Sequence, residues 1–245
     1  MTRLGGRASD EALLVRRGGM AATAFRVRLI YHVLLAAFGP QGWWPGGDPF
    51  ETVVGAVLTQ NTSWRNVERA LANLRSAGAL ADPDAMSGLA PGELEDLVRP
   101  AGFYRQKAST LKRLLARTSG EPGGLRGVLS RDGAWLRRWL VETKGIGPET
   151  ADSIALYASG HPTFVVDAYA RRLAERHGLI RSGASYAALK ALFEDALPRS
   201  ARVMNEYHAL IVRLGKTRCR PRPDCGRCPL SWDLGGRGPQ SPGRP

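Results

Sequence analysis

Apolar side chains recur at helical spacing along most of the chain, which is the pattern of helices packed around a core. The predicted helices cover residues 21–38, 50–58, 64–77, 91–98, 106–116, 125–129, 134–143, 149–159, 167–177, 186–196 and 201–214. Breaks rich in Gly and Pro separate them, and only residues 163–166 are predicted to be extended. With no strand-rich region and no internal repeat, the fold class is predicted to be all-α.

The two ends of the chain are expected to lie outside this helical body. Residues 1–20 are rich in Arg and Gly and predict a disordered basic extension, with Met20 as an alternative start. Residues 235–245 are of low complexity and predict a disordered tail. No secretory signal and no run of about 20 apolar residues is evident. The sequence therefore argues against a membrane protein, and an intracellular location in the cytoplasm or nucleoid is expected.

Charge and cysteine content narrow the class of partner. The 245 residues include 35 Lys and Arg against 22 Asp and Glu, a net charge of +13 that favours a polyanion such as nucleic acid. An Arg-rich solvated surface would give the same balance. The three cysteines, Cys219, Cys225 and Cys228, lie within ten residues. Such clustering indicates a metal or iron–sulfur site in a reducing compartment rather than a disulfide framework.

A hairpin between two predicted helices has the features of a phosphate-binding turn. Gly145 and Gly147 flank the apolar Ile146, and Pro148 opens the next helix, where its missing N–H costs nothing. The glycines permit a tight turn and close approach of a phosphate to the helix N-terminus. The residues predicted to contact DNA here are Lys144, Gly145, Ile146, Gly147 and Thr150.

The segment HPTFVVD that follows places Asp167 at the start of the next helix, where an Asp is most often only a cap. With the hairpin upstream, the chain resembles the endonuclease III-like superfamily of helix-hairpin-helix base-excision glycosylases over residues 25–230. The resemblance implies that Asp167 is catalytic. It also implies a two-lobed fold, with a six-helix barrel domain at 51–162 and a terminal lobe from residues 21–50 and 163–234.

Glu149 distinguishes between branches of that superfamily. In the bifunctional members a lysine follows the hairpin and attacks the sugar, and the matching position here is Glu149. A carboxylate cannot form an imine. The sequence therefore predicts a monofunctional glycosylase, in which Asp167 stabilises the oxocarbenium-like sugar and orients or deprotonates the attacking water.

Several runs in order resemble the endonuclease III-type 3-methyladenine DNA glycosylases: WWP at 43–45, GAVLTQNT at 55–62, RPAGFYRQKA at 99–108 and KGIGPETAD at 144–152. The resemblance implies that Gln60 or its neighbours Asn61 and Thr62 fill the gap left by the flipped base. It also implies that the base pocket is lined by Trp43, Trp44 and Trp64. A cationic alkylated adenine suits such indoles, because each cation–π contact is worth about 0.5–2 kcal/mol.

The cysteine loop resembles the four-cysteine [4Fe–4S] loop of these relatives, but the final cysteine is missing from residues 229–234. Three thiolates hold a cluster only if water or another side chain serves the fourth iron. The cofactor is thus expected to be a [4Fe–4S] cluster with an incomplete ligand set, and a decayed or zinc-bound loop stays open as an alternative.

The leading hypothesis is a monomeric glycosylase that binds double-stranded DNA and releases an alkylated purine. A second hypothesis keeps the fold but makes the substrate an oxidised or deaminated pyrimidine, with abasic-site lyase activity. A third, of another class, is a noncatalytic damage-sensing DNA-binding module. Asp167 argues against the third, because binding alone does not require it.

Overall fold

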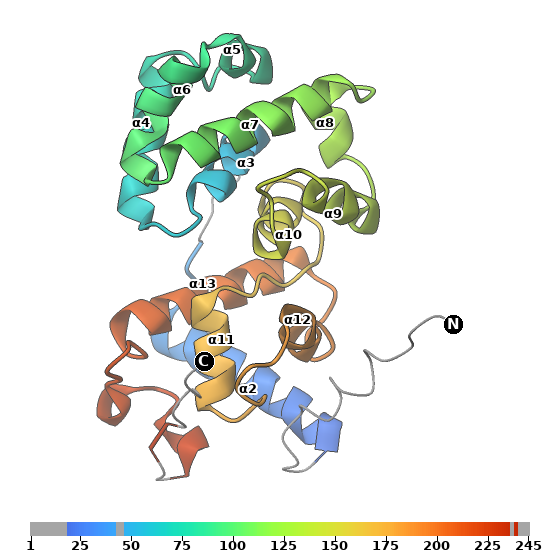
Figure 1. Cartoon of the computed structure of the whole chain (residues 1–245). Helices are drawn as coiled ribbons and strands as arrows, with labels where there is room; N and C mark the ends of the chain where they lie inside the picture. Colours follow the sequence, from blue (N-terminus) through green and yellow to red (C-terminus); the bar gives the residue numbers. More distant parts are fainter. Residues whose placement is uncertain (1–18, 43–46, 236–237, 240–245) are drawn as a thin grey trace. The chain divides into compact units, whose positions relative to one another are not determined.

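The computed structural model describes residues 19–42, 47–235 and 238–239. The chain divides into two compact units, each considered by itself: unit 1 comprises residues 1–43 and 162–245, and unit 2 comprises residues 44–161. Every regular element of the described residues is a helix (Figure 1), so the prediction of an all-α fold is confirmed.

Unit 2 is formed around the short apolar helix α3. Its helices are α3 (Pro49–Leu58), α4 (Trp64–Ser76), α5 (Pro83–Gly88), α6 (Pro91–Val98), η1 (Arg99–Ala101), α7 (Tyr104–Ser119), α8 (Gly124–Leu129), α9 (Gly133–Val141) and α10 (Pro148–Tyr157). All of α3 except its first and third residues is buried, and α4, α7 and α10 pack against it. A helix that is apolar on every side needs such enclosure.

Unit 1 joins the two ends of the chain. It contains α2 (Gly19–Phe38), α11 (Ala168–Arg176), α12 (Tyr186–Glu194), α13 (Ala201–Thr217), η2 (Cys225–Arg227) and η3 (Ser231–Leu234). Figure 1 shows α2 in blue beside α13 in orange-red, and the hydroxyl of the buried Tyr207 on α13 donates to the Val27 carbonyl of α2 at 2.9 Å. Helices from opposite ends of the sequence therefore share one core.

Helix α2 departs from two expectations. It begins at Gly19 rather than at residue 21, and the Gly19 carbonyl accepts a hydrogen bond from the hydroxyl of Thr23 at 3.4 Å. By length and composition alone the helix is also long and apolar enough to cross a membrane, which was not expected from the sequence. Its Val27, Ile30 and Leu34 are buried within unit 1, which is the pattern of a core helix as well.

The remaining helices lie close to their predicted positions, with two informative differences. Helix α7 covers 104–119 rather than 106–116, and α5 was not predicted at all. Only six residues long, α5 depends on Asp82, whose carboxylate accepts from the Ala85 N–H at 2.7 Å, and on the burial of Met86. One cap and one buried side chain give too little periodicity to recognise in a sequence.

Candidate functional site

The hairpin turn between α9 and α10 is held by its backbone conformation and by α7. Gly145 has a φ of 101°, which residues other than glycine rarely adopt. A Cβ at Gly145 would lie 2.1 Å from the hydroxyl oxygen of Thr110 on α7. Ile146 is buried in the core of unit 2, as expected for a residue that packs between the two helices. Gly145 is therefore required both for the turn and for its packing.

Gly147 and the start of α10 present the open side of the same turn. Gly147 is the N-cap residue of α10, and a Cβ added there would meet no atom within 4 Å. Pro148 occupies the first helical turn, and Lys144 and Glu149 are exposed. The start of α10 thus has open space beside Gly147, as an anion-binding helix terminus requires.

Gln60 links the segment after α3 to this hairpin. Its side-chain amide donates to the Gly145 carbonyl at 3.0 Å and to the Thr150 hydroxyl at 2.9 Å. Thr150 is buried, so its hydroxyl is used within unit 2. Asn61 next to Gln60 is exposed with a φ of 51°, and Thr62 is half-buried. The structure therefore brings the predicted residues of the hairpin and of this segment together.

A buried lysine that the sequence analysis missed joins two loops of unit 2. The Lys107 ammonium donates to the Leu58 carbonyl at 3.0 Å and to the Ala101 carbonyl at 2.7 Å. These carbonyls end α3 and η1, just before residues 59–62 and 102–103. Burial lowers the pKa of Lys107 to about 8.

Phe103, which no pattern had singled out, follows directly on this anchor. Its side chain is 63% exposed and its φ is 46°, in the left-handed region. A bulky residue in that region is strained, and backbone strain of this kind concentrates at functional sites. The available signal was the RPAGFY run, in which a large apolar residue follows a glycine in a break between helices.

In unit 1, Asp167 is a helix cap and also the partner of a buried histidine. One carboxylate oxygen accepts from the Ala170 N–H at 2.8 Å, and the other lies 3.4 Å from Nε2 of His208 on α13. Burial raises the pKa of Asp167, but the charge and hydrogen bonding of His208 and the backbone N–H groups outweigh it. The net shift is downward, so Asp167 is ionised at neutral pH.

Three features position this pair. The carboxylate of Glu194 accepts from the Thr163 hydroxyl at 3.0 Å and from the Phe164 N–H at 2.8 Å, which fixes the segment before Asp167. The buried ring of Phe164 meets His208 edge-on, with centroids 6.3 Å apart. Because Gly215 has no side chain, α13 can approach Tyr169 on α11, where a Cβ would lie 2.2 Å from the ring.

Of the three tryptophans assigned to the base pocket, the structure describes only Trp64. Trp43 and Trp44 lie outside the described residues. Trp64 begins α4, packs half-buried against the core of unit 2, and donates from Nε1 to the Glu68 carboxylate at 2.9 Å.

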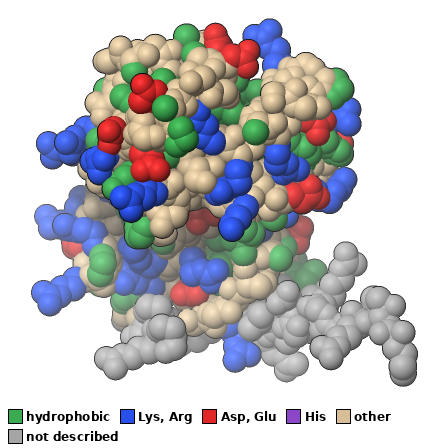
Figure 2. Space-filling model, turned by 45° about the horizontal axis from the view of Figure 1, so that its top comes forward, with side chains coloured by type: hydrophobic (Ala, Val, Ile, Leu, Met, Phe, Trp, Pro, Cys, Tyr) green, Lys and Arg blue, Asp and Glu red, His purple; other side chains and the backbone are tan. Residues whose placement is uncertain are grey.

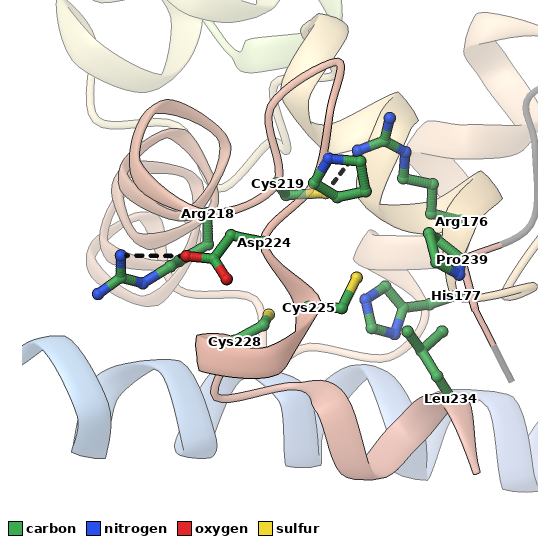
Figure 3. Close-up of a pocket in the computed structure, with 10 residues that line it drawn as sticks. Arg176, His177, Arg218, Cys219, Asp224, Cys225, Cys228, Leu234 and Pro239 are labelled. Carbon is green, nitrogen blue, oxygen red and sulfur yellow. Dashed lines mark hydrogen bonds and ion pairs between the residues drawn. The ribbon is translucent and has the colours of Figure 1, made fainter. Parts of the chain in front are cut away.

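The cysteine loop encloses a pocket in unit 1 (Figure 3). The free thiols of Cys219, Cys225 and Cys228 all line it, together with His177. The Arg176 guanidinium lies 3.3 Å from the Cys219 sulfur, and it donates to backbone carbonyls of the loop. No three His, Cys, Asp or Glu side chains in the described part of the chain are placed to hold a single metal ion.

The surface charge follows the composition. Lys and Arg side chains are spread over the face presented in Figure 2, with acidic side chains between them. On this face the positive side chains are therefore spread over several elements rather than gathered on one helix.

The helix-hairpin-helix, the capped aspartate and the all-helical units define a base-excision DNA glycosylase fold. Residues 54–199 match the HhH-GPD superfamily base excision DNA repair proteins, and the chain belongs to this family. It is 43% identical over 203 residues to a candidate DNA repair glycosylase of Methanocaldococcus jannaschii, covering 82% of this chain and 92% of that protein.

Two solved structures have the same fold. One is H. pylori 3-methyladenine DNA glycosylase (MagIII) bound to 1,N6-ethenoadenine, with a TM-score of 0.69 and 29% identity, covering 79% of this chain and 97% of the other. The second is a trapped endonuclease III–DNA covalent intermediate, with a TM-score of 0.73 and 23% identity, covering 84% of this chain and 93% of the other. The predicted resemblance to the endonuclease III-like superfamily is confirmed.

Proposed function

We propose that this protein is a monofunctional DNA glycosylase that releases an alkylated purine such as 3-methyladenine from double-stranded DNA inside the cell, acting as a monomer. The observation that carries the proposal is the state of Asp167, a largely buried carboxylate kept ionised by its partners. Glu149, at the position where bifunctional relatives have a lysine, supports hydrolysis without strand cleavage.

Release of an alkylated adenine would require little catalysis beyond what one carboxylate, that of Asp167, can supply. An adenine alkylated at N3 is cationic and already a good leaving group, so acid catalysis at the base is not required. As the glycosidic bond breaks, positive charge develops on the sugar, and a fixed carboxylate stabilises it electrostatically. The same carboxylate orients or deprotonates the water that attacks the anomeric carbon. His208 holds Asp167 in the ionised form that both tasks need.

The loops of unit 2 would bind the duplex and keep the base extruded. The N-terminus of α10 and Lys144 would bind phosphate, and residues 60–62, which the Gln60 amide ties to the hairpin, would fill the vacated position. Phe103, exposed and anchored through Lys107, is suited to insert between base steps as apolar wedge residues do. Such insertion offsets part of the few kcal/mol that flipping costs.

The alkylpurine assignment rests on the indoles and on the relatives. Trp64, with Trp43 and Trp44, would stack on the flipped cationic base. The 29% identity to a 3-methyladenine DNA glycosylase structure supports this choice over a pyrimidine substrate. The cysteine loop would hold a [4Fe–4S] cluster with a structural role, since three free cysteine side chains line one pocket.

The test uses duplexes that carry 3-methyladenine, thymine glycol, uracil or an abasic site, each with and without borohydride. We expect release of free 3-methyladenine, identified by mass spectrometry, and no trapped covalent complex. A trapped complex would refute the monofunctional mechanism. Release of thymine glycol or uracil instead would move the substrate to pyrimidines, and binding without release from any duplex would indicate a noncatalytic module.

A further inference from the structure

The pocket in unit 1 contains one donor that the sequence analysis did not consider. Besides the three thiols, it is lined by the imidazole of His177, which follows α11 directly. Leu234 lines it too (Figure 3), six residues after Cys228, within the segment where the resemblance places the missing cysteine. An apolar side chain therefore occupies the region of the fourth thiolate, and a histidine stands in the same pocket.

His177 is held in the manner of a metal-binding histidine. Its Nδ1 lies 2.8 Å from a carboxylate oxygen of Asp233, and the two side chains are only 5% and 3% exposed. Asp233 is itself fixed by two hydrogen bonds from the Arg26 guanidinium, at 3.0 and 2.8 Å. When Nδ1–H donates to a carboxylate, the lone pair of the neutral ring is on Nε2, as in carboxylate–histidine–metal arrangements.

We propose that His177 is the fourth protein ligand of the [4Fe–4S] cluster, bound through Nε2, and that the three cysteine thiolates are the others. The inference rests on the proposal that this loop holds a cluster. Arg26 and Asp233 set the tautomer and the orientation of the ring.

The donor set suits a cluster better than a single zinc ion. A tetrahedral zinc brings all of its ligands to one ion. No three His, Cys, Asp or Glu side chains of the described residues are placed to hold one metal ion. In a four-iron cluster each protein ligand binds a different iron, so the ligands surround the cluster instead of meeting at one atom. The three thiols and the imidazole line one pocket (Figure 3), as that arrangement requires.

Charge is consistent with the same assignment. The Arg176 guanidinium donates a hydrogen bond to the Cys219 sulfur at 3.3 Å, which places a positive charge beside this ligand. Replacing a fourth thiolate with a neutral imidazole removes one negative charge from the ligand set. Imidazole ligation raises the reduction potential of iron–sulfur centres. The cluster of this protein should therefore be reduced more readily than one with four thiolates.

The decisive measurement is made on the full-length wild-type protein, purified without oxygen. We expect four irons and four sulfides per chain, and a directly coordinated histidine nitrogen in pulsed EPR of the reduced cluster. Labelling with 15N-histidine should shift that signal. A four-iron cluster without a coordinated nitrogen would refute the role of His177 but leave the cluster itself. Protein that contains only zinc, or no metal, would refute both; base release, assayed separately, reports on the glycosylase.

Variants add a second readout. His177→Ala should lose the nitrogen signal and release iron to a chelator at least tenfold faster. Adding Leu234→Cys to that variant should restore the slow release of iron, because the new cysteine supplies a fourth thiolate ligand. His161→Ala is the matched control, since His161 lies in unit 2 with Nε2 2.9 Å from the Arg131 carbonyl. Circular dichroism verifies folding of each variant. Equal iron release from His177→Ala and His161→Ala would contradict the proposal.

Discussion

The hairpin of unit 2 and the aspartate site of unit 1 are assembled in different ways. In the hairpin, the features suited to binding a phosphate lie in the backbone: Gly145 makes the turn and Gly147 leaves the start of α10 open. At Asp167, the ionised state depends on a side chain from another helix, because His208 on α13 lowers the pKa of the carboxylate. The sequence motif therefore identifies nearly all of the residues that form the hairpin. At the second site it identifies Asp167 but not its partner His208.

The largest effect is expected at the aspartate. Asp167→Asn keeps an N-cap acceptor but loses the charge that pairs with His208, so the protein should remain folded with a modest loss of stability. Base release should fall by at least about 100-fold, since positioned acid–base and electrostatic groups contribute on that order or more. Single-turnover assays with 3-methyladenine DNA measure the loss, and fluorescence anisotropy verifies that DNA binding persists. Full activity in this variant would remove Asp167 from the mechanism.

Substitution of His208 is expected to have the second-largest effect, mainly on the pH dependence of base release. Asp167 has a pKa below its usual 3.8, so base release should persist as the pH falls to that range. His208→Leu removes the contact that lowers the pKa, so activity should disappear at a higher pH and drop roughly tenfold at neutral pH.

His208→Gln, which can still donate a hydrogen bond, should recover part of both effects. The same shift makes ionised Asp167 stabilising above pH 3.8, and this stabilisation is lost as the pH falls further. The measurement is a pH profile of single-turnover rates for the three proteins. An unchanged acid limb in His208→Leu would mean that the histidine serves only the packing of unit 1.

The two hairpin glycines should respond differently to the same substitution. Gly145→Ala forces a Cβ against Thr110 at a positive φ and should destabilise the protein by about 1–3 kcal/mol, weakening DNA binding as a consequence. Gly147→Ala should leave stability within about 0.5 kcal/mol and weaken binding directly, by holding phosphate away from the helix terminus. Thermal unfolding and salt-dependent binding curves separate the two. Equal losses of stability would contradict this division of roles.

The smallest effect on base release is expected at Phe103, which lies in the loop before α7. Phe103→Gly relieves the left-handed strain and should stabilise the protein by up to about 1 kcal/mol. Release of a base from a fully paired duplex should slow severalfold, whereas release from single-stranded DNA should be unaffected. If both substrates respond alike, Phe103 does not act on the duplex.

Local signals account for what could be predicted. The helices, the turn at Gly145 and the capping position of Asp167 each depend on residues within a few positions, so they could be read from the sequence. Lys107, His177 and His208 acquire their roles from partners on other elements, and each alone is an ordinary helical or loop residue. The short helix α5 could not be predicted, because only one N-cap and one buried methionine stabilise it.

Lys107 has a consequence for how such an enzyme can diversify. It binds main-chain carbonyls at the ends of α3 and η1, and therefore makes no demand on the side chains of residues 59–62 and 102–103. Those loop residues can be exchanged while the points from which they project remain fixed. Relatives with different lesion preferences could thus arise by substitution at the loop tips, without any change in the scaffold that presents them.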